Sequence, residues 1–555
     1  MNFKELLAYF PSIEQWSEWF VYDSEHPLLF NSGLFLGLFL AFYAIYILLR
    51  KRFRLRLLYV VLFSLFFYYK SSGLFFLLLI GTTILDYFLA GIMVKETREG
   101  WRKFYLVISI VSNLGILGYF KYTNFFIDSL NQLSGSDFHL RAILLPVGIS
   151  FFTFQSISYI MEIYRKEIAP AKTYLDYVFY ISFFPQLVAG PIVKAKEFLP
   201  QVYKGVKLTK AEVNEGLLLI IGGLIKKAII SDYISVNFVD RVFDAPNTYS
   251  AFENLMAVYG YAIQIYCDFS GYSDMAIGLA LLLGYRLPIN FNVPYQSASI
   301  TEFWRRWHIS LSTWLKEFLY ISVGGNRRGS FGGYLFPSLF FIGMLWWGIS
   351  FWETSPIPLY LSAGSVLLFI GTIVFVRDSK KALYTNFNLL TTMLLGGLWH
   401  GASLRFIVWG ALHGLGLAFH KTVQALVPKA KAAPLWWQKL WRLFSILLTF
   451  HFVCLGWVFF RARDFDVALQ VLGNIGTLQW NPEKWVAIME GYYPVFLLIG
   501  IGFVWHFLPK RWMAGLGGIF YRLPLLFKGV FIGLVFWLVY AIASTGPQPF
   551  IYFQF

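Results

Sequence analysis

Residues 288–328 read PINFNVPYQSASITEFWRRWHISLSTWLKEFLYISVGGNRR and combine features that the rest of the chain keeps apart. Two tryptophans, two arginines and a histidine follow one another at the centre, from Trp304 to His308. Long apolar runs flank the segment, and ionisable residues at membrane depth are costly, so they mark candidate functional sites. The pattern predicts an irregular start from Pro288 to Tyr295. It then predicts a helix from Ser310 to Tyr320, closed by a loop at Gly324–Arg328.

The composition is that of a membrane protein. Of the 555 residues 58% are hydrophobic and only 14% are charged, whereas soluble domains carry about a quarter charged residues. The net charge of +16 is explained by Lys and Arg clusters between apolar runs, which is typical of cytoplasmic loops. No basic face alternates with polar surface, so we expect no nucleic-acid partner. Membrane lipid is the expected surrounding.

The spacing of cysteine residues excludes two further classes. Cys267 and Cys454 each lie in an apolar run, so no disulfide framework is indicated. No Cys/His spacing typical of a metal site occurs, and we expect neither a metal nor a bound cofactor.

Apolar runs and basic clusters predict an all-α polytopic protein with roughly eleven transmembrane helices plus short or re-entrant ones. Residues 28–49 form the first span, and an acidic start before it makes this an uncleaved anchor. Five of the seven residues 50–56 are basic, which places that end in the cytoplasm and the N-terminus outside. Pro185, Gly190 and Pro191 indicate broken backbone within 174–193, which is tolerated only inside protein or beside water.

The remaining predicted spans follow from the same pattern: 57–69 and 73–90 (both short), 104–118, 142–163, 213–230, 254–284, 333–351, 357–376, 387–424 in two pieces, 438–460, 493–508 and 524–545. A polar outer loop is expected from Asp128 to Arg141. No linker long enough to separate a soluble domain is present, so residues 1–555 are predicted to form a single membrane domain.

His400 is the first candidate catalytic residue. It lies between two apolar runs, and Gly396, Gly397, Gly401 and Ala402 surround it. Small residues let another backbone or a substrate approach closely. A histidine there can accept a proton from a hydroxyl group, as the general base of acyl transfer must. The alternative is a buried histidine whose two nitrogens are satisfied by its neighbours.

His308 is the second candidate. On a continuous helix Thr301, Trp304, Arg305 and His308 would share one face, and His308 would orient a reacting group or hold developing negative charge. The alternative is a juxtamembrane helix whose arginines meet lipid phosphates and whose tryptophans belong to the aromatic belt. Candidate substrate-binding residues of this region and of the His400 motif are Trp304, Arg305, Asn290 and Trp399.

Other polar residues in apolar runs are expected to be structural. This applies to Asp86, Glu162, Asp268 and Asp274, which we expect to pair with Tyr, Arg or backbone groups. His413 and His420 share a helix face, but no third metal ligand lies nearby. The sequence contains no Gly-x-Ser-x-Gly elbow and no P-loop, which argues against hydrolase triads and NTP-driven pumps.

The chain ends in an aromatic tail, PFIYFQF, at residues 549–555. Such a tail after a span can be an interfacial anchor. Alternatively, the Tyr552 hydroxyl could receive an acyl group as a covalent carrier.

Several motifs resemble the membrane-bound O-acyltransferases, in the bacterial branch that contains alginate O-acetyltransferase and the related D-alanyl transferase of teichoic acids. The resemblance covers about residues 50–460, and residues 461–555 add the last spans and the tail. It rests on these stretches: PVGISFFTFQ (146–155), FPQLVAGP (184–191), DFSGYSD (268–274), the stretch from Phe303 to Ser312, GGNR (324–327) and GLWHGA (397–402).

The resemblance implies a ring of helices around a central funnel, with the catalytic histidine of the family at His400 and its second polar position at His308. The tail is similar to a motif that a small membrane partner carries in D-alanylation systems, which would make Tyr552 an acyl relay. The implied function is transfer of an acyl group, acetyl above all, from a cytoplasmic thioester across the bacterial inner membrane to an exported polysaccharide. The donor would be acetyl-CoA or an acylated carrier protein. The partners would be a periplasmic or membrane-anchored acetyltransferase and the polysaccharide export machinery.

Two other functions stay open at this point. One is a D-alanyl or other acyl transferase that a carrier protein supplies. The other is a polysaccharide or lipid transporter, in which the buried histidines would line a path. Donor chemistry separates them, because a transporter consumes no thioester.

Overall fold

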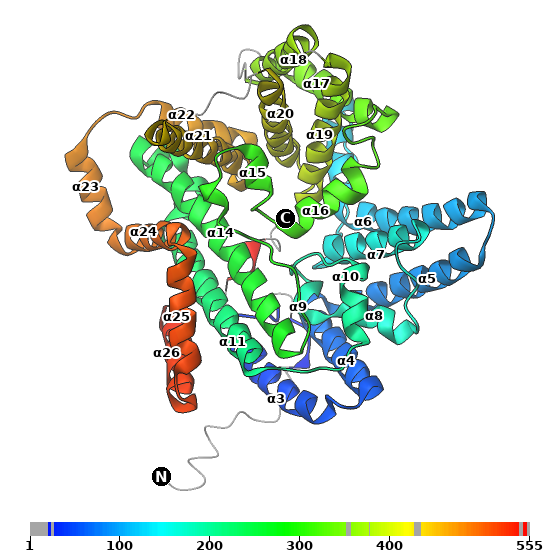
Figure 1. Ribbon diagram of the computed structural model, residues 1–555. Helices are drawn as coiled ribbons and strands as arrows, with labels where there is room; N and C mark the ends of the chain where they lie inside the picture. The colour runs from blue at the N-terminus through cyan, green and yellow to red at the C-terminus, as the bar shows by residue number, and fades with distance from the viewer. Residues whose placement is uncertain are drawn as a thin grey trace. The chain divides into compact units, whose positions relative to one another are not determined.

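The computed structural model describes residues 20–23, 27–350, 357–376, 378–426, 434–542 and 548–551 (Figure 1). Every regular element in these residues is a helix, which confirms the predicted all-α class. The chain divides into two compact units, each made of separate stretches. Unit 1 comprises Met1–Ile229, Asp268–Pro288 and Ala514–Gln554, and unit 2 comprises Ile230–Cys267 and Ile289–Met513. The division does not test the prediction of a single membrane domain.

Unit 1 begins with long helices and continues with short ones. Its elements are α3 (Gly33–Leu49), α4 (Phe53–Ser72), α5 (Phe76–Lys95), α6 (Glu99–Ser134), α7 (Ile149–Tyr164), α8 (Tyr174–Ser182), α9 (Phe184–Leu187), α10 (Ala195–Val202), α11 (Lys210–Leu224) and α26 (Leu525–Ile542). A π-helix, η2 (Ile225–Ser231), continues α11, and its residues up to Ile229 belong to this unit. The end of α14 (Ala251–Leu282), from Asp268 on, also belongs to this unit.

The predicted break between residues 174 and 193 is confirmed. Helix α8 ends at Ser182, α9 lasts for four residues, and the backbone after it is irregular and buried. Side chains satisfy this backbone: the Gln186 amide donates to the Tyr180 carbonyl (2.6 Å), and the Tyr180 hydroxyl donates to the Val193 carbonyl (2.6 Å). Non-helical backbone at membrane depth requires such partners inside the protein.

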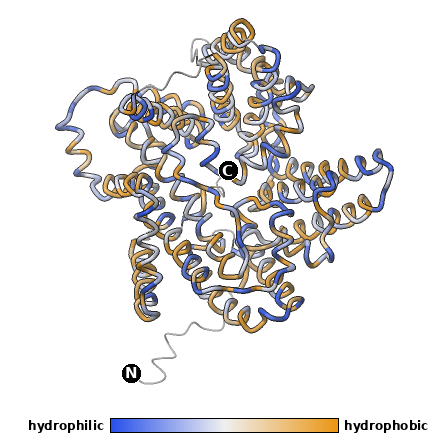
Figure 2. Tube along the Cα trace, viewed as in Figure 1, coloured by the Kyte–Doolittle hydropathy of each residue, from blue (hydrophilic) through white to orange (hydrophobic). Residues whose placement is uncertain are grey.

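Two predicted boundaries in unit 1 were wrong. Helices α4 and α5 each have 20 residues, enough for a hydrocarbon core of roughly 30 Å, because charged residues at the ends of the apolar runs are also helical. The predicted loop from Asp128 begins inside α6, which continues to Ser134. Figure 2 shows apolar residues along α5 and α6 and polar residues in the connection between them.

Unit 2 contains α12 (Asp232–Ile234), α13 (Asp240–Asp244), the start of α14, α15 (Ile300–Trp304), α16 (Ile309–Trp314), α17 (Phe331–Ser350), α18 (Ile357–Phe375), α19 (Ser379–His400), α20 (Leu404–Leu426), α21 (Leu435–Arg461), α22 (Phe465–Gly476), α23 (Pro482–Gly491) and α24 (Tyr493–Phe507). Two π-helices, η3 (Ser235–Val239) and η6 (Leu315–Tyr320), belong here, and α25 (Lys510–Arg522) begins here. The pattern did not predict α22, α23 and α25, which are short and lie outside the predicted apolar runs.

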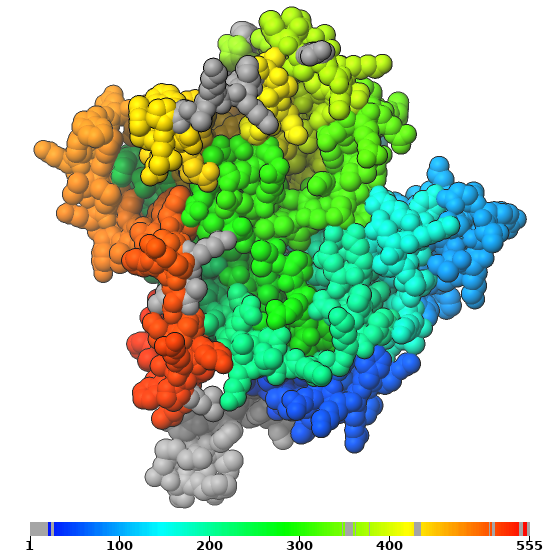
Figure 3. All heavy atoms as spheres, viewed as in Figure 1, coloured from blue at the N-terminus to red at the C-terminus, as the bar shows by residue number. Residues whose placement is uncertain are grey.

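Helices α17 to α20 pack side by side in Figure 1. Buried Phe369, Leu390, Leu394 and Ala411 form the core among α18, α19 and α20. By contrast, the first turns of α21 (yellow in Figure 3) lie on the surface, where Trp436, Trp437 and Trp441 are exposed. Exposed tryptophans of this kind are typical of side chains at a membrane interface.

The helices identify a multi-pass membrane protein, but the predicted count of roughly eleven crossings stays a prediction. In the described residues, three helical stretches are long and apolar enough to cross a membrane: Phe53–Lys95, Glu99–Ser134 and Leu435–Arg461. The pair α23 and α24, bent by 95°, would make a fourth. Shorter apolar helices occur at Gly33–Leu49, Phe331–Trp346, Ser362–Phe375 and Leu526–Ile542.

Candidate active site

His400 is the last residue of α19, and a glycine-lined contact with α20 holds it there. A Cβ atom at Gly397 would lie 2.1 Å from the Phe406 carbonyl oxygen, and one at Gly410 would lie 2.2 Å from the Met393 carbonyl oxygen. Only glycine permits this approach of the two backbones, which confirms the predicted role of the small residues. The position of His400 is therefore fixed by backbone packing.

Aromatic rings surround the His400 imidazole. Its ring centroid lies 4.9 Å from that of Trp409, 5.0 Å from that of Trp399 and 5.4 Å from that of Phe460, and the residue is 3% exposed. These rings give the imidazole an apolar surrounding on the sides that they face.

His308 lies between α15 and α16 in a conformation that is uncommon for a residue other than glycine, with φ 43° and ψ 55°. Its Nδ1 is 3.2 Å from the Asn290 Oδ1 atom. The same oxygen accepts the Ser310 backbone N–H (3.2 Å) and the Ser310 hydroxyl (2.9 Å). Because the amide oxygen of Asn290 can only accept hydrogen bonds, the His308 Nδ1 atom must be the donor. In His308, Nδ1 therefore carries the proton and Nε2 carries the lone pair.

The irregular segment before α15 is tied to the turn that carries His308. The Ile309 N–H donates to the Asn290 carbonyl, and the Asn292 N–H donates to the Arg306 carbonyl, both at 2.9 Å. The Arg306 guanidinium donates to the Asn292 carbonyl (3.2 Å) and to Glu302 (2.7 Å). These bonds make the predicted irregular start a rigid support for His308.

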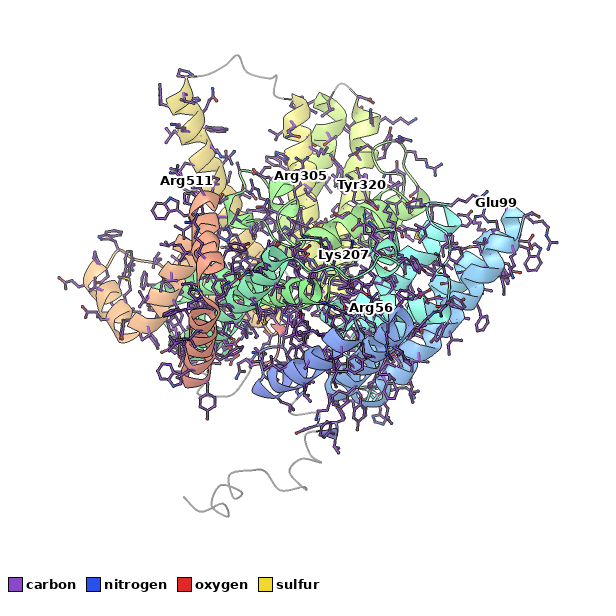
Figure 4. The ribbon with its side chains drawn as sticks, turned by 60° about the horizontal axis from the view of Figure 1, so that its bottom comes forward. Arg56, Glu99, Lys207, Arg305, Tyr320 and Arg511 are labelled. Atoms are coloured by element: carbon purple, nitrogen blue, oxygen red, sulfur yellow. The ribbon has the colours of Figure 1, made fainter. Side chains whose placement is uncertain are left out.

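The prediction that residues 301, 304, 305 and 308 share a helix face was wrong. Helix α15 ends at Trp304, and His308 precedes α16 in the left-handed region, so these side chains separate. The Thr301 hydroxyl is 2.8 Å from His420 Nδ1. The ring centroid of Trp304 lies 5.8 Å from that of Trp409 and 5.2 Å from that of His413. Arg305 is exposed at the end of α15 (Figure 4).

Trp399 links the two candidate histidines. Its ring centroid lies 6.1 Å from that of His308 and 5.0 Å from that of His400. The closing loop of the segment also binds α19, because the Asn388 amide donates to the carbonyls of Gly325 (2.9 Å) and Arg328 (3.0 Å). Of the predicted site residues, the structure therefore brings together His308, Asn290, Trp399 and His400.

Burial lowers the pKa of His308 to about 3. His308 lies between the candidate spans, at a position that is 0% exposed, and desolvation disfavours its charged form. The imidazole is therefore neutral near pH 7, in the tautomer that the Asn290 oxygen selects.

The sequence did not single out several residues around these histidines. The ring centroid of Trp409 lies 4.9 Å from that of His400 and 4.8 Å from that of His413. Ser310 and His308 both donate to the side-chain oxygen of Asn290. The π-helix η6 directly follows α16, and such helices occur often at functional sites. Spacing carries no signal for Ser310, because its partner Asn290 lies 20 residues away. Trp409 and His413, by contrast, lie four residues apart on the same helix, α20, so helical spacing could have grouped them.

The other polar residues that lie in apolar runs fall outside this cluster. In the described residues no group of three or more His, Cys, Asp or Glu side chains could hold a metal ion. The Asp86 carboxylate accepts hydrogen bonds from Ser109 (2.6 Å) and Asn113 (3.1 Å). Asp268 and Asp274 form ion pairs with lysines. We had expected partners among Tyr, Arg and backbone groups only. Tyr552 lies outside the described residues.

Comparison with known proteins identifies the class of protein as an acyltransferase. The profile of the membrane-bound O-acyltransferase family matches residues 166–351. A probable alginate O-acetylase, AlgI, of Pseudomonas aeruginosa is 37% identical over 465 residues, which cover 81% of this chain and 76% of that protein. A peptidoglycan O-acetyltransferase of Helicobacter pylori is 35% identical over 480 residues, covering 81% and 80%. A teichoic acid D-alanyltransferase of Bacillus subtilis is 27% identical over 327 residues, covering 58% and 69%.

The chain belongs to the membrane-bound O-acyltransferase family. It is an O-acyltransferase, which confirms the resemblance seen in the sequence and removes the transporter from consideration. The profile match includes His308 and ends before His400.

Proposed function

We propose that the protein transfers an acetyl group from a cytoplasmic thioester to an exported polysaccharide at the bacterial inner membrane, with its N-terminus in the periplasm. The proposal is supported by two similar proteins whose names state O-acetylation of alginate and of peptidoglycan. A large thioester donor does not cross a bilayer, whereas a membrane-embedded site can accept the acyl group from one side and release it on the other.

His400 is the proposed general base. The observation that carries this role is its fixed place at the end of the α19–α20 contact, within an aromatic surrounding and beside the Trp399 ring that also contacts His308. The imidazole removes the proton of the attacking hydroxyl while its oxygen bonds to the thioester carbonyl carbon. The C–S bond then breaks, and the leaving sulfur takes the proton.

His308 is proposed to hold a polar hydrogen of the bound substrate. With Nδ1 donating to Asn290, Nε2 is an acceptor, whereas stabilising an oxyanion would require a proton on Nε2. The tautomer therefore favours the orienting role of the two that the sequence left open. Trp399, Trp304 and Arg305 stay candidates for substrate contacts, and Arg305 reaches only what approaches from outside the cluster.

Tyr552 is the proposed first acyl acceptor. Its phenol would replace the thiol of the donor and form a tyrosyl ester, and a periplasmic or membrane-anchored acetyltransferase would pass the acetyl group to a polysaccharide hydroxyl. Mass spectrometry of the C-terminal peptide after incubation with donor should find an added acetyl group on Tyr552. An unmodified Tyr552 during turnover would remove this step and leave direct transfer.

The second candidate function is D-alanyl or other acyl transfer from a carrier protein. It is favoured by the similarity to the D-alanyltransferase of Bacillus subtilis. Supplying acetyl-CoA, acetylated carrier and aminoacylated carrier in parallel separates the donors.

The test in cells is the amount of ester-linked acetate on secreted polysaccharide. His400→Ala should abolish it at unchanged membrane abundance. His139→Ala removes an exposed histidine and should leave it unchanged. Full acetylation with His400→Ala would contradict the proposal.

A further inference from the structure

A buried ion pair in unit 1 lies where two helices approach through glycine residues. Lys227 Nζ is 2.6 Å from Asp268 Oδ1, and the two side chains are only 3% and 4% exposed. A Cβ atom at Gly271 would lie 2.7 Å from the Gly223 carbonyl oxygen, so glycine is required at this approach to α14. Burial of two charges is costly unless further hydrogen bonds satisfy them.

Those further bonds come from the end of the chain. Lys227 Nζ donates to the Pro549 carbonyl (3.3 Å), and the Ile551 N–H donates to Asp268 Oδ2 (3.1 Å). The Lys227 ammonium thus binds the carbonyl of the residue before Phe550, and the Asp268 carboxylate binds the amide of the residue after it. Because one partner only donates and the other accepts, the pair recognises the direction of the bound backbone.

An aromatic site holds the side chain between these two backbone contacts. The Phe550 ring stacks on Tyr272 (4.8 Å between centroids, 28°) and lies 5.4 Å from Phe269. Tyr272 in turn stacks on Phe30 at 4.8 Å. Phe550 is 1% exposed, which does not fit an anchor lying in the membrane interface.

We propose that Lys227, Asp268, Phe269 and Tyr272 form a peptide-binding site whose ligand is the C-terminal segment of the same chain, residues 548–551. The site selects a backbone that runs in one direction and an aromatic side chain in its centre. It deepens the function proposed above, because any transfer through the residues that follow Ile551 would start from this fixed backbone. The binding itself does not depend on acyl transfer.

Hydrogen–deuterium exchange of the full chain in nanodiscs tests the site through the Ile551 amide. Phe550→Ala removes the aromatic anchor and leaves the ion pair. Lys227→Met combined with Asp268→Leu removes both backbone contacts and leaves neither charge of the pair behind. Tyr540→Ala is the matched control, because that tyrosine near the same end of the chain is 85% exposed.

We expect slow exchange at Ile551 in the wild type and in Tyr540→Ala, and at least about tenfold faster exchange in both site variants, since local opening frees the amide. Exchange at the rate of an unstructured peptide in the wild type would overturn the proposal, as would unchanged protection in both site variants. His400→Ala should keep the protection, so loss of transfer and loss of tail binding are separable. Slow exchange with no acyl transfer in any variant would support the site and contradict the proposed function.

Discussion

In each unit, glycine residues let two helices approach closely near a buried polar side chain, but the polar side chains differ. In unit 2, Gly397 and Gly410 bring α19 and α20 together, and His400 follows three residues after Gly397. In unit 1, Gly223 and Gly271 bring α11 and α14 together, and Lys227 follows four residues after Gly223. In both cases a polar side chain about one turn after a glycine lies where its surroundings are fixed by backbone packing.

The difference lies in the charge of what is enclosed. Lys227 is paired with Asp268, whereas aromatic rings surround His400. Removing one member of a buried ion pair leaves an uncompensated charge, so changes in unit 1 act on folding first. Truncating His400, the proposed general base, is expected to act on acyl transfer first. Similar packing therefore encloses an ion pair in one unit and a candidate catalytic histidine in the other.

The largest effect is expected from filling the glycine contact of unit 2. In Gly397→Ala the new Cβ would lie 2.1 Å from a backbone oxygen, so α19 and α20 must separate, at a cost of about 4 kcal/mol or more. We expect little monodisperse protein after detergent extraction. Gly371→Ala in α18, where nothing lies within 4 Å of the added atom, should purify like the wild type. Equal yields would show that the contact is not needed.

The ion pair of unit 1 is expected to show a smaller effect that a second change reverses. Asp268→Leu alone leaves the Lys227 ammonium buried without its carboxylate, which should cost about 3–5 kcal/mol and lower the melting temperature. Adding Lys227→Met should restore much of the loss. If the double variant melts no higher than Asp268→Leu, the pair is not the cause.

The support of His308 can be tested without touching the histidine. Asn290→Ala removes the oxygen that accepts from Nδ1 and from Ser310, so the imidazole loses its orientation. A misplaced catalytic group can cost about 100-fold, and we expect a fall of that order in kcat. The conservative Asn290→Asp variant retains an acceptor oxygen and should recover part of the rate. Asn326→Ala, which changes an exposed asparagine, is the control, and an equal effect there would refute the assignment.

The smallest effect is expected from pH. The pKa of His308 falls to about 3 in the fold, below the usual histidine value of about 6.5. Below pH ~6.5 the unfolded chain binds a proton at His308 that the folded chain does not bind. The contribution of His308 to the free energy of unfolding is therefore fully present above pH ~6.5 and is lost as the pH falls toward about 3. The melting temperature of the wild type should drop more between pH values of about 7.5 and 5 than that of His308→Gln. Parallel curves would show that His308 does not titrate in this way.

The sequence was informative where the signal was local. The small residues around His400 predicted the close contact of α19 and α20, and the prolines after α8 predicted the break in the backbone. The prediction that Thr301 and His308 share a helix face was wrong, because the amino-acid sequence does not indicate that His308 adopts a positive φ and interrupts the helix.

Pairings across long separations could not be predicted. Lys227 lies 41 residues before Asp268 (268 minus 227), and the tail contacts of Asp268 come from residue 551. The shared neighbour of the two candidate histidines, Trp399, lies 91 residues after His308 (399 minus 308). Such pairs depend on how helices pack, which apolar periodicity in a membrane protein does not specify.

The central claim is that His400 performs the proton transfer of an acyltransferase. Purified protein in nanodiscs, supplied with radiolabelled acetyl thioester on CoA and on carrier protein, tests it most directly. The wild type and His139→Ala should consume the thioester and retain or pass on the label. His400→Ala, at the same melting temperature, should do neither. Wild-type turnover by folded His400→Ala would contradict the account.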